Sequence, residues 1–140
     1  MLYVLLLIYF LFFSEGYGRI AEEERIYRYN LKPFVEIRRF WMYREQVGLS
    51  AFFMNIFGNV IGFIPLGFIL PVISRRCRSG FLIVLSGFSL SLCVETIQVV
   101  TRVGCFDVDD LILNTAGAVA GYVLFAVCNY LRRRHYGEKI

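Results

Sequence analysis

Long apolar runs, separated by shorter polar segments, dominate the pattern of hydrophobic and polar positions along the chain. Four runs approach the roughly 20 apolar residues that a membrane-spanning helix needs. They cover residues 1–17, 51–73, 80–101 and 109–131. The pattern predicts an all-α integral membrane helical bundle of about four transmembrane helices. We expect a single domain over residues 1–140, because no segment is left for a separate soluble module.

The first run is the weakest of the predicted spans. Its uninterrupted apolar part, residues 1–13, would extend only about 20 Å as a helix, against a hydrocarbon core of about 30 Å. Including residues 14–17 lengthens it but brings polar side chains to the interface. We predict a transmembrane helix here. The alternative is a signal-anchor of a chain that starts further upstream.

The polar connection between the first two runs, residues 18–50, contains a second kind of pattern. Pro33 disfavours helix at the residue before it and therefore predicts a turn. After it, Phe34, Ile37, Phe40 and Trp41 recur at near-helical spacing, opposite charged residues. This predicts a short amphipathic helix. It either lies on the membrane surface, with its aromatic side chains at headgroup level, or packs on other loops of the protein.

Composition and charge placement support the membrane assignment and suggest an orientation. The chain is 58% hydrophobic, and its mean hydropathy is +0.61. Basic residues cluster at Arg75, Arg76 and Arg78, and again in the tail after residue 131. Because basic loops stay inside, we predict a multi-pass cell-membrane protein whose residues 74–79 and C-terminus are cytoplasmic. No basic face recurs on a soluble element, so we expect no nucleic-acid partner.

A polar stripe interrupts the third run. Glu95 lies inside an apolar segment, where an ionised carboxylate costs free energy. We therefore interpret Glu95 as a functional residue. Gln98 and Arg102 share its helical face, and Asn114 begins a similar stripe on the fourth run. We predict a helical hairpin with facing polar stripes near the outer membrane surface. The full candidate site comprises Asn55, Asn59, Glu95, Gln98, Arg102, Asp107, Asp109, Asp110 and Asn114.

Two interpretations of this polar cluster differ in function. It is either a hydrogen-bond network that joins three helices, or a pocket open to the outer leaflet, and we favour the pocket. In a pocket, Arg102 would meet a phosphate or carboxylate, and Glu95 could serve as an acid or base. For Asp107, Asp109 and Asp110 we favour helix capping over binding of a divalent cation. We predict no metal and no cofactor, and we assign no catalytic residue.

Small residues predict how the helices pack. Gly58 with Gly62, and Gly117 with Gly121, form two G-x-x-x-G pairs that allow close helix contact, either within the chain or with a partner. Cys93 and Cys128 fall inside spans, and we expect them to be small core residues rather than a disulfide.

Several of these segments, taken in order, resemble the VanZ-like family of bacterial membrane proteins. The matching segments are N-L-K-P-F (30–34), N-I-F-G-N-V-I-G-F-I-P-L-G-F-I-L-P (55–71), E-T-I-Q (95–98), Thr101 with Arg102, F-D-V-D-D-L-I-L-N-T-A-G (106–117), and Gly121 with Tyr122. The resemblance implies a multi-spanning helical protein, linked in some members to lower susceptibility to glycopeptides such as teicoplanin. It implies no established reaction. It marks Glu95, Gln98, Arg102, Asp107, Asp109, Asp110 and Asn114 as site residues without catalytic roles.

Three functional hypotheses follow. The first is a non-enzymatic envelope protein that binds an amphiphile, either a lipid-linked cell-wall intermediate or a lipoglycopeptide, at the outer leaflet. The second is a small membrane enzyme that acts on a lipid-linked phosphate or glycan, with Glu95 as acid or base. The third is a helical subunit that forms a homo- or hetero-oligomer through its G-x-x-x-G faces.

Overall fold

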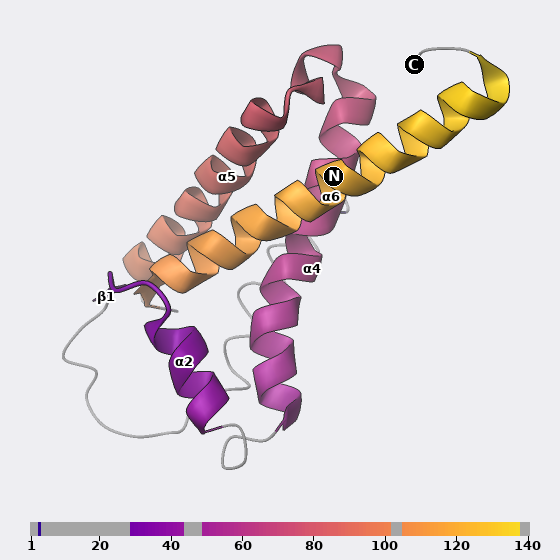
Figure 1. Ribbon diagram of the computed structural model, residues 1–140. Helices are drawn as coiled ribbons and strands as arrows, with labels where there is room; N and C mark the ends of the chain where they lie inside the picture. Colours follow the sequence, from indigo (N-terminus) through magenta and orange to yellow (C-terminus); the bar gives the residue numbers. More distant parts are fainter. Residues whose placement is uncertain (1–2, 4–28, 44–48, 102–104, 138–140) are drawn as a thin grey trace.

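A computed structural model describes residue 3 and residues 29–43, 49–101 and 105–137 (Figure 1). Helices make up nearly all of this part of the chain, as predicted. The order of elements is β1 (Tyr29–Asn30), α2 (Val35–Met42), α4 (Leu49–Ile73), the 3-10 helix η2 (Arg75–Arg78), α5 (Gly80–Val100), β2 (Phe106–Asp107) and α6 (Val108–Tyr136).

Three of the described helices are long and apolar enough to cross a membrane. Their apolar windows are Ile56–Ile73, Gly80–Val100 and Val108–His135. This confirms the second, third and fourth predicted runs. The first predicted run lies outside the described residues except for Tyr3, whose hydroxyl donates a hydrogen bond to the carbonyl of Gly62 at 2.9 Å. Tyr3 also packs against the core of the bundle.

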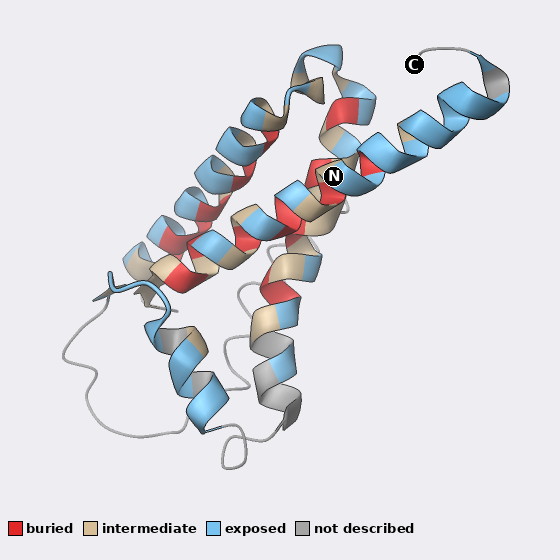
Figure 2. Ribbon diagram, viewed as in Figure 1, coloured by how far each residue is buried: buried red, intermediate tan, exposed pale blue. Residues whose placement is uncertain are grey.

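The core lies between α4, α5 and α6, where each helix buries one narrow face (Figure 2). It is built from Phe63 of α4, Ile83 and Val94 of α5, and Ala118 of α6. The opposite faces remain exposed and apolar; Phe81 and Val100 of α5 are among the most exposed. Since lipid tails are as apolar as these side chains, such outer faces suit a bilayer.

Glycines allow α6 to cross α4 closely. Gly117 and Gly121 lie directly against the backbone carbonyls of Val60 and Ile64. The predicted close packing of this G-x-x-x-G pair is therefore confirmed. On α4 the matching glycine is Gly67, which lies against the carbonyl of Ala118 and was not singled out from the sequence.

The fourth predicted span is longer than its expected limits, 109–131. Helix α6 begins at Val108 and continues to Tyr136, so the first part of the basic tail is helical. Gly137 ends it in a left-handed conformation (φ 67°) and donates its N–H to the carbonyl of Arg133 at 3.0 Å. Basic side chains in the last turn also interact favourably with the helix dipole, which explains the extension.

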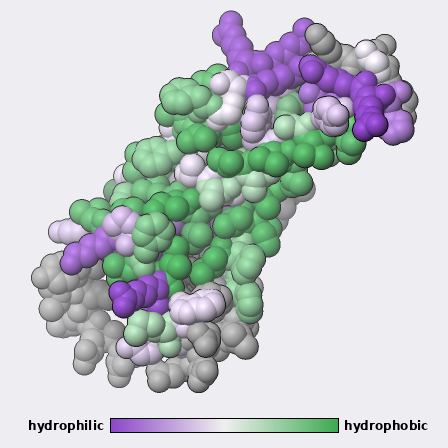
Figure 3. All heavy atoms as spheres, viewed as in Figure 1, coloured by the Kyte–Doolittle hydropathy of each residue, from purple (hydrophilic) through white to green (hydrophobic). Residues whose placement is uncertain are grey.

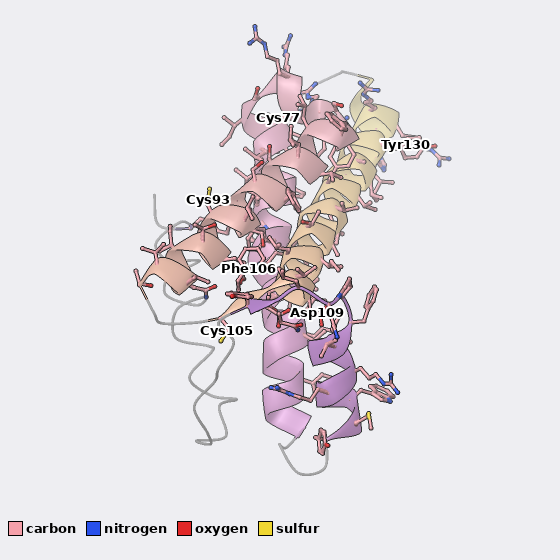
Figure 4. All side chains as sticks on the ribbon, turned by 90° about the vertical axis from the view of Figure 1, so that its left-hand side faces the viewer. Cys77, Cys93, Cys105, Phe106, Asp109 and Tyr130 are labelled. Atoms are coloured by element: carbon pink, nitrogen blue, oxygen red, sulfur yellow. The ribbon has the colours of Figure 1, made fainter. Side chains whose placement is uncertain are left out.

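The prediction that Cys93 and Cys128 are core residues is wrong. Both are free thiols with exposed side chains, and Cys93 points away from the other helices (Figure 4). The reason is geometric, because each helix buries only one narrow stripe and these positions fall on the other side of it.

Two short strands, which the sequence analysis missed, join the polar connection to the bundle. Residues Tyr29 and Asn30 of β1 pair in parallel with Phe106 and Asp107 of β2. The predicted turn at Pro33 follows, and the predicted amphipathic helix is confirmed as α2. Its position on the membrane surface remains a prediction.

Candidate functional site

Buried polar side chains gather where α5 ends and α6 begins. We call this region, together with β1 and β2, the polar end. Figure 4 shows Phe106 and Asp109 there, at the opposite end of the bundle from Cys77. The buried polar side chains of the described residues are no more than 7% exposed; they are Asn59, Ser91, Glu95, Gln98, Asp109 and Asn114.

Glu95 connects the last turns of α5 to β2. Its side chain is 2% exposed, and its Oε2 accepts the backbone N–H of Asp107 at 3.0 Å. Asp107 in turn caps α6, because its Oδ1 accepts the N–H of Asp109 at 2.9 Å. The same oxygen lies 3.5 Å from the donating Nδ2 of Asn30 in β1. Glu95 thus helps to fix the strand that positions the start of α6.

Asp109 fixes α2 to the bundle. Its Oδ1 accepts the backbone N–H of Phe34 and its Oδ2 accepts that of Ile37 at 3.1 Å. Phe34 is the N-cap residue of α2, has a left-handed conformation (φ 65°) and supplies no side-chain cap of its own. A carboxylate from α6 therefore performs the capping that α2 lacks, where the helix dipole favours negative charge.

A third contact links α4 to α6. The Nδ2 of Asn59 donates to Oδ1 of Asp110 at 2.6 Å. This brings together two of the predicted site residues that are 51 positions apart. The other predicted residue of this helix, Asn55, lies within α4, but its side chain is outside the described part of the structure.

The deepest contact joins the two facing stripes. Asn114 of α6 is fully buried and donates its Nδ2 to the hydroxyl of Ser91 at 2.9 Å. Its Oδ1 is also buried and has no hydrogen-bond partner among the described residues. Gln98, which is 1% exposed, lies on the same buried stripe of α5. The facing stripes predicted from the sequence are therefore present.

Sequence reasoning missed Ser91, although its spacing offered a signal. Ser91 lies four residues before Glu95, so the polar stripe could have been extended by one helical turn. Arg102, which was predicted to complete the cluster with Glu95 and Asn114, lies outside the described residues. The other two are buried in the same part of the bundle.

The capping interpretation of the three aspartates is confirmed in part and extended. Asp107 caps α6, as expected. Asp109 instead caps α2, and Asp110 binds Asn59. Within the described ranges, no group of three His, Cys, Asp or Glu side chains is arranged to hold a metal ion.

Helix α2 also brings positive charge to the polar end. Asp109 of α6 caps its first turn. The exposed side chains of Lys32, Arg38 and Arg39 lie along α2 or just before it. The sequence showed these cations but gave no sign that the segment is joined to α6. The polar end thus combines buried carboxylates and amides with exposed cations, a set that can bind both hydroxyl and phosphate groups.

Comparison with known proteins gives the chain a family. It is 29% identical to "Protein VanZ" of Enterococcus faecium over 147 residues, an alignment that covers 99% of this chain and 75% of that protein. No solved structure matches it. The profile of the VanZ/LLP1 family matches residues 1–129. This match spans all of the polar end, and the chain therefore belongs to the VanZ/LLP1 family of membrane proteins.

Proposed function

We propose that this VanZ-like membrane protein binds the headgroup of an amphiphile at its polar end, in the outer leaflet. The ligand is a lipid-linked cell-wall intermediate or a lipoglycopeptide. Its binding alters the envelope and lowers susceptibility to glycopeptides such as teicoplanin. The protein acts by binding and not by catalysis.

One observation carries the proposal. Polar side chains from α4, α5 and α6 converge at one end of an otherwise apolar bundle, and the buried Oδ1 of Asn114 has no partner among the described residues. A buried carbonyl oxygen without a donor costs about 1–3 kcal/mol. A hydroxyl or amide donor of a ligand would recover part of that cost, whereas packing alone would be served better by an apolar side chain.

The surroundings favour an amphiphile over a soluble ligand. The exposed cations of α2 lie beside the polar end and suit phosphate, which arginine binds in a bidentate manner. Ile97 and Val100 of α5 and Ile112 of α6 are exposed next to the polar residues. A long hydrocarbon chain can lie along these side chains while its headgroup occupies the polar end.

Two features favour binding over the alternative functions. Oε2 of Glu95 already accepts a backbone N–H, which is a structural use of the carboxylate rather than a catalytic one. The Gly117 and Gly121 face is covered by α4 of the same chain, so an oligomer would have to use another surface.

The proposal predicts a change of drug susceptibility in cells. Cells that carry the wild-type protein should tolerate more teicoplanin than cells without it, and vancomycin is tested in parallel. Glu95→Gln should reduce this tolerance, because a neutral amide oxygen binds the N–H of Asp107 less strongly than the carboxylate does and so loosens β2 and the polar end. The measurement is the minimal inhibitory concentration of each drug.

A matched variant separates loss of function from loss of protein. Thr96 is the neighbour of Glu95 but lies on the exposed side of α5. Thr96→Val should therefore keep the wild-type tolerance. Membrane levels of all variants are measured on immunoblots. Equal tolerance with wild type and Glu95→Gln, at equal protein levels, would contradict the proposal.

A further inference from the structure

The end of the bundle opposite the polar end carries a dense set of arginines. We call it the basic end and define it by η2 and the last two turns of α6. Figure 3 shows hydrophilic side chains gathered there, beyond the apolar middle of the molecule. Its described cationic side chains are Arg75, Arg76, Arg78, Arg132, Arg133 and Arg134.

The segments of the chain that flank these arginines contain no carboxylate. The sequence has no Asp or Glu in residues 56–94 or 111–137. Just beyond, residues 138–140 add one Glu and one Lys, which cancel. Among the described side chains, the carboxylates of Glu95, Asp107, Asp109 and Asp110 lie at the polar end, and the arginines of η2 and of the end of α6 lie at the opposite end.

With the polar end at one membrane surface, helix length places the arginines at the depth of the lipid headgroups on the other side. Helix α6 has 29 residues, or about 43 Å at 1.5 Å per residue, which exceeds a hydrocarbon core of about 30 Å. With its start held at the polar end, its last turns pass beyond the hydrocarbon. The first η2 arginine lies two residues after Ile73, the last residue of the apolar window of α4.

Apolar side chains adjoin the charges on both elements. Ile73 before η2 is 77% exposed, and Phe81 after it is 73% exposed. On α6, Tyr130 is 63% and Leu131 is 50% exposed, directly before Arg132. A ligand that contacts both the arginines and these apolar side chains must carry an anionic group and hydrocarbon chains. A nucleic acid or a soluble acidic protein does not combine the two.

Part of this surface is held in place by hydrogen bonds. Nε of Arg78 donates to the carbonyl of Pro71 at 3.3 Å, and the hydroxyl of Tyr122 donates to the carbonyl of Arg78 at 2.6 Å. These bonds tie η2 to α4 and α6, so Arg75 and Arg76 project from a fixed turn. A fixed backbone places these two side chains on one surface before a phosphate binds, which limits the ordering that binding requires.

We propose that the basic end is a binding surface for anionic phospholipids, with the guanidinium groups of η2 and α6 contacting the phosphate. The site is separate from the polar end and does not depend on the proposed function. It would hold the protein in a leaflet rich in anionic lipid and keep α4, α5 and α6 together at that end.

The test is native mass spectrometry of the detergent-purified full chain with dioleoyl phosphatidylglycerol or dioleoyl phosphatidylcholine. The wild type should retain phosphatidylglycerol in preference to phosphatidylcholine, and added salt should weaken this retention. Arg75→Gln with Arg76→Gln should weaken phosphatidylglycerol binding by about tenfold, as should the triple change of Arg132, Arg133 and Arg134 to Gln.

Ser79→Ala is the matched control, because it changes an exposed side chain at the basic end without removing a charge. It should leave phosphatidylglycerol binding unchanged. The arginine variants lie on two separate elements, and the thermal midpoint of each shows whether it is folded. The proposal is overturned by equal retention of both lipids in the wild type, by no loss in either folded arginine variant, or by an equal loss in the control.

Discussion

At the scale of single residues, Asp109 shows how a side chain in one helix can determine the position of another. It is 1% exposed and accepts backbone N–H groups from residues 34 and 37. From the sequence it could be recognised as a residue near a helix N-terminus. Which helix it caps depends on a contact across more than 70 residues, and local spacing carries no information about such contacts.

Replacing Asp109 should therefore loosen α2 more than α6. Asp109→Ala leaves the N–H groups of Phe34 and Ile37 without their acceptor, at a cost of about 1–2 kcal/mol. Hydrogen exchange followed by mass spectrometry should show faster exchange in residues 34–42. The peptide covering residues 118–130 of α6 should change little. Equal acceleration in both peptides would mean that Asp109 holds the whole fold and not α2 in particular.

Asn114 shows what spacing does predict. The polar stripes on the third and fourth runs were visible as helical repeats, and the structure places them face to face. A repeat of polar residues within an apolar run defines a helix face without any knowledge of neighbours. Asn59 was found for the same reason, but its bond to Asp110 was not, since pairing depends on how the helices cross.

At the scale of elements, the crossing of α4 and α6 is the main packing contact of the described bundle. Its two glycines on α6 contact backbone carbonyls of α4 directly, so a side chain at either position has no room. The G-x-x-x-G pattern predicted close packing. It could not identify α4 as the partner, because the pattern describes only one of the two surfaces.

Gly117→Leu should separate α4 from α6 and destabilise the bundle. Overpacking of this kind costs typically about 1–3 kcal/mol, and contact with backbone is less easily relieved than contact with a flexible side chain. Gly80→Ala is the matched control, since its added Cβ would meet the Tyr122 ring at an ordinary 3.5 Å. Thermal unfolding in detergent should show a lower midpoint for the first variant alone. A midpoint unchanged by Gly117→Leu would contradict the close crossing.

The strands are the elements that the sequence did not predict. Each has two residues, too few for an alternating pattern to show. Their pairing depends on Glu95, which binds the backbone of Asp107, and on the close approach of two segments about 77 residues apart. Such a long-range contact depends on how the helices pack and leaves no local pattern in the sequence.

At the scale of the whole molecule, the chain is a helical bundle with two chemically different ends. The apolar runs and the basic clusters predicted this organisation, because both are properties of continuous segments. They did not predict that the polar connection closes over one end through β1 and α2. Carboxylates, amides and the exposed cations of α2 thereby share one region, and binding is proposed there on that basis.

Direct binding to the polar end is the most decisive measurement. Purified protein in lipid nanodiscs is titrated calorimetrically with a polyprenyl diphosphate-linked saccharide precursor and, separately, with teicoplanin. The account predicts saturable binding of at least one of them, weakened by Glu95→Gln and unchanged by Thr96→Val. Absence of binding by the folded wild type, or equal affinity for all three proteins, would contradict it.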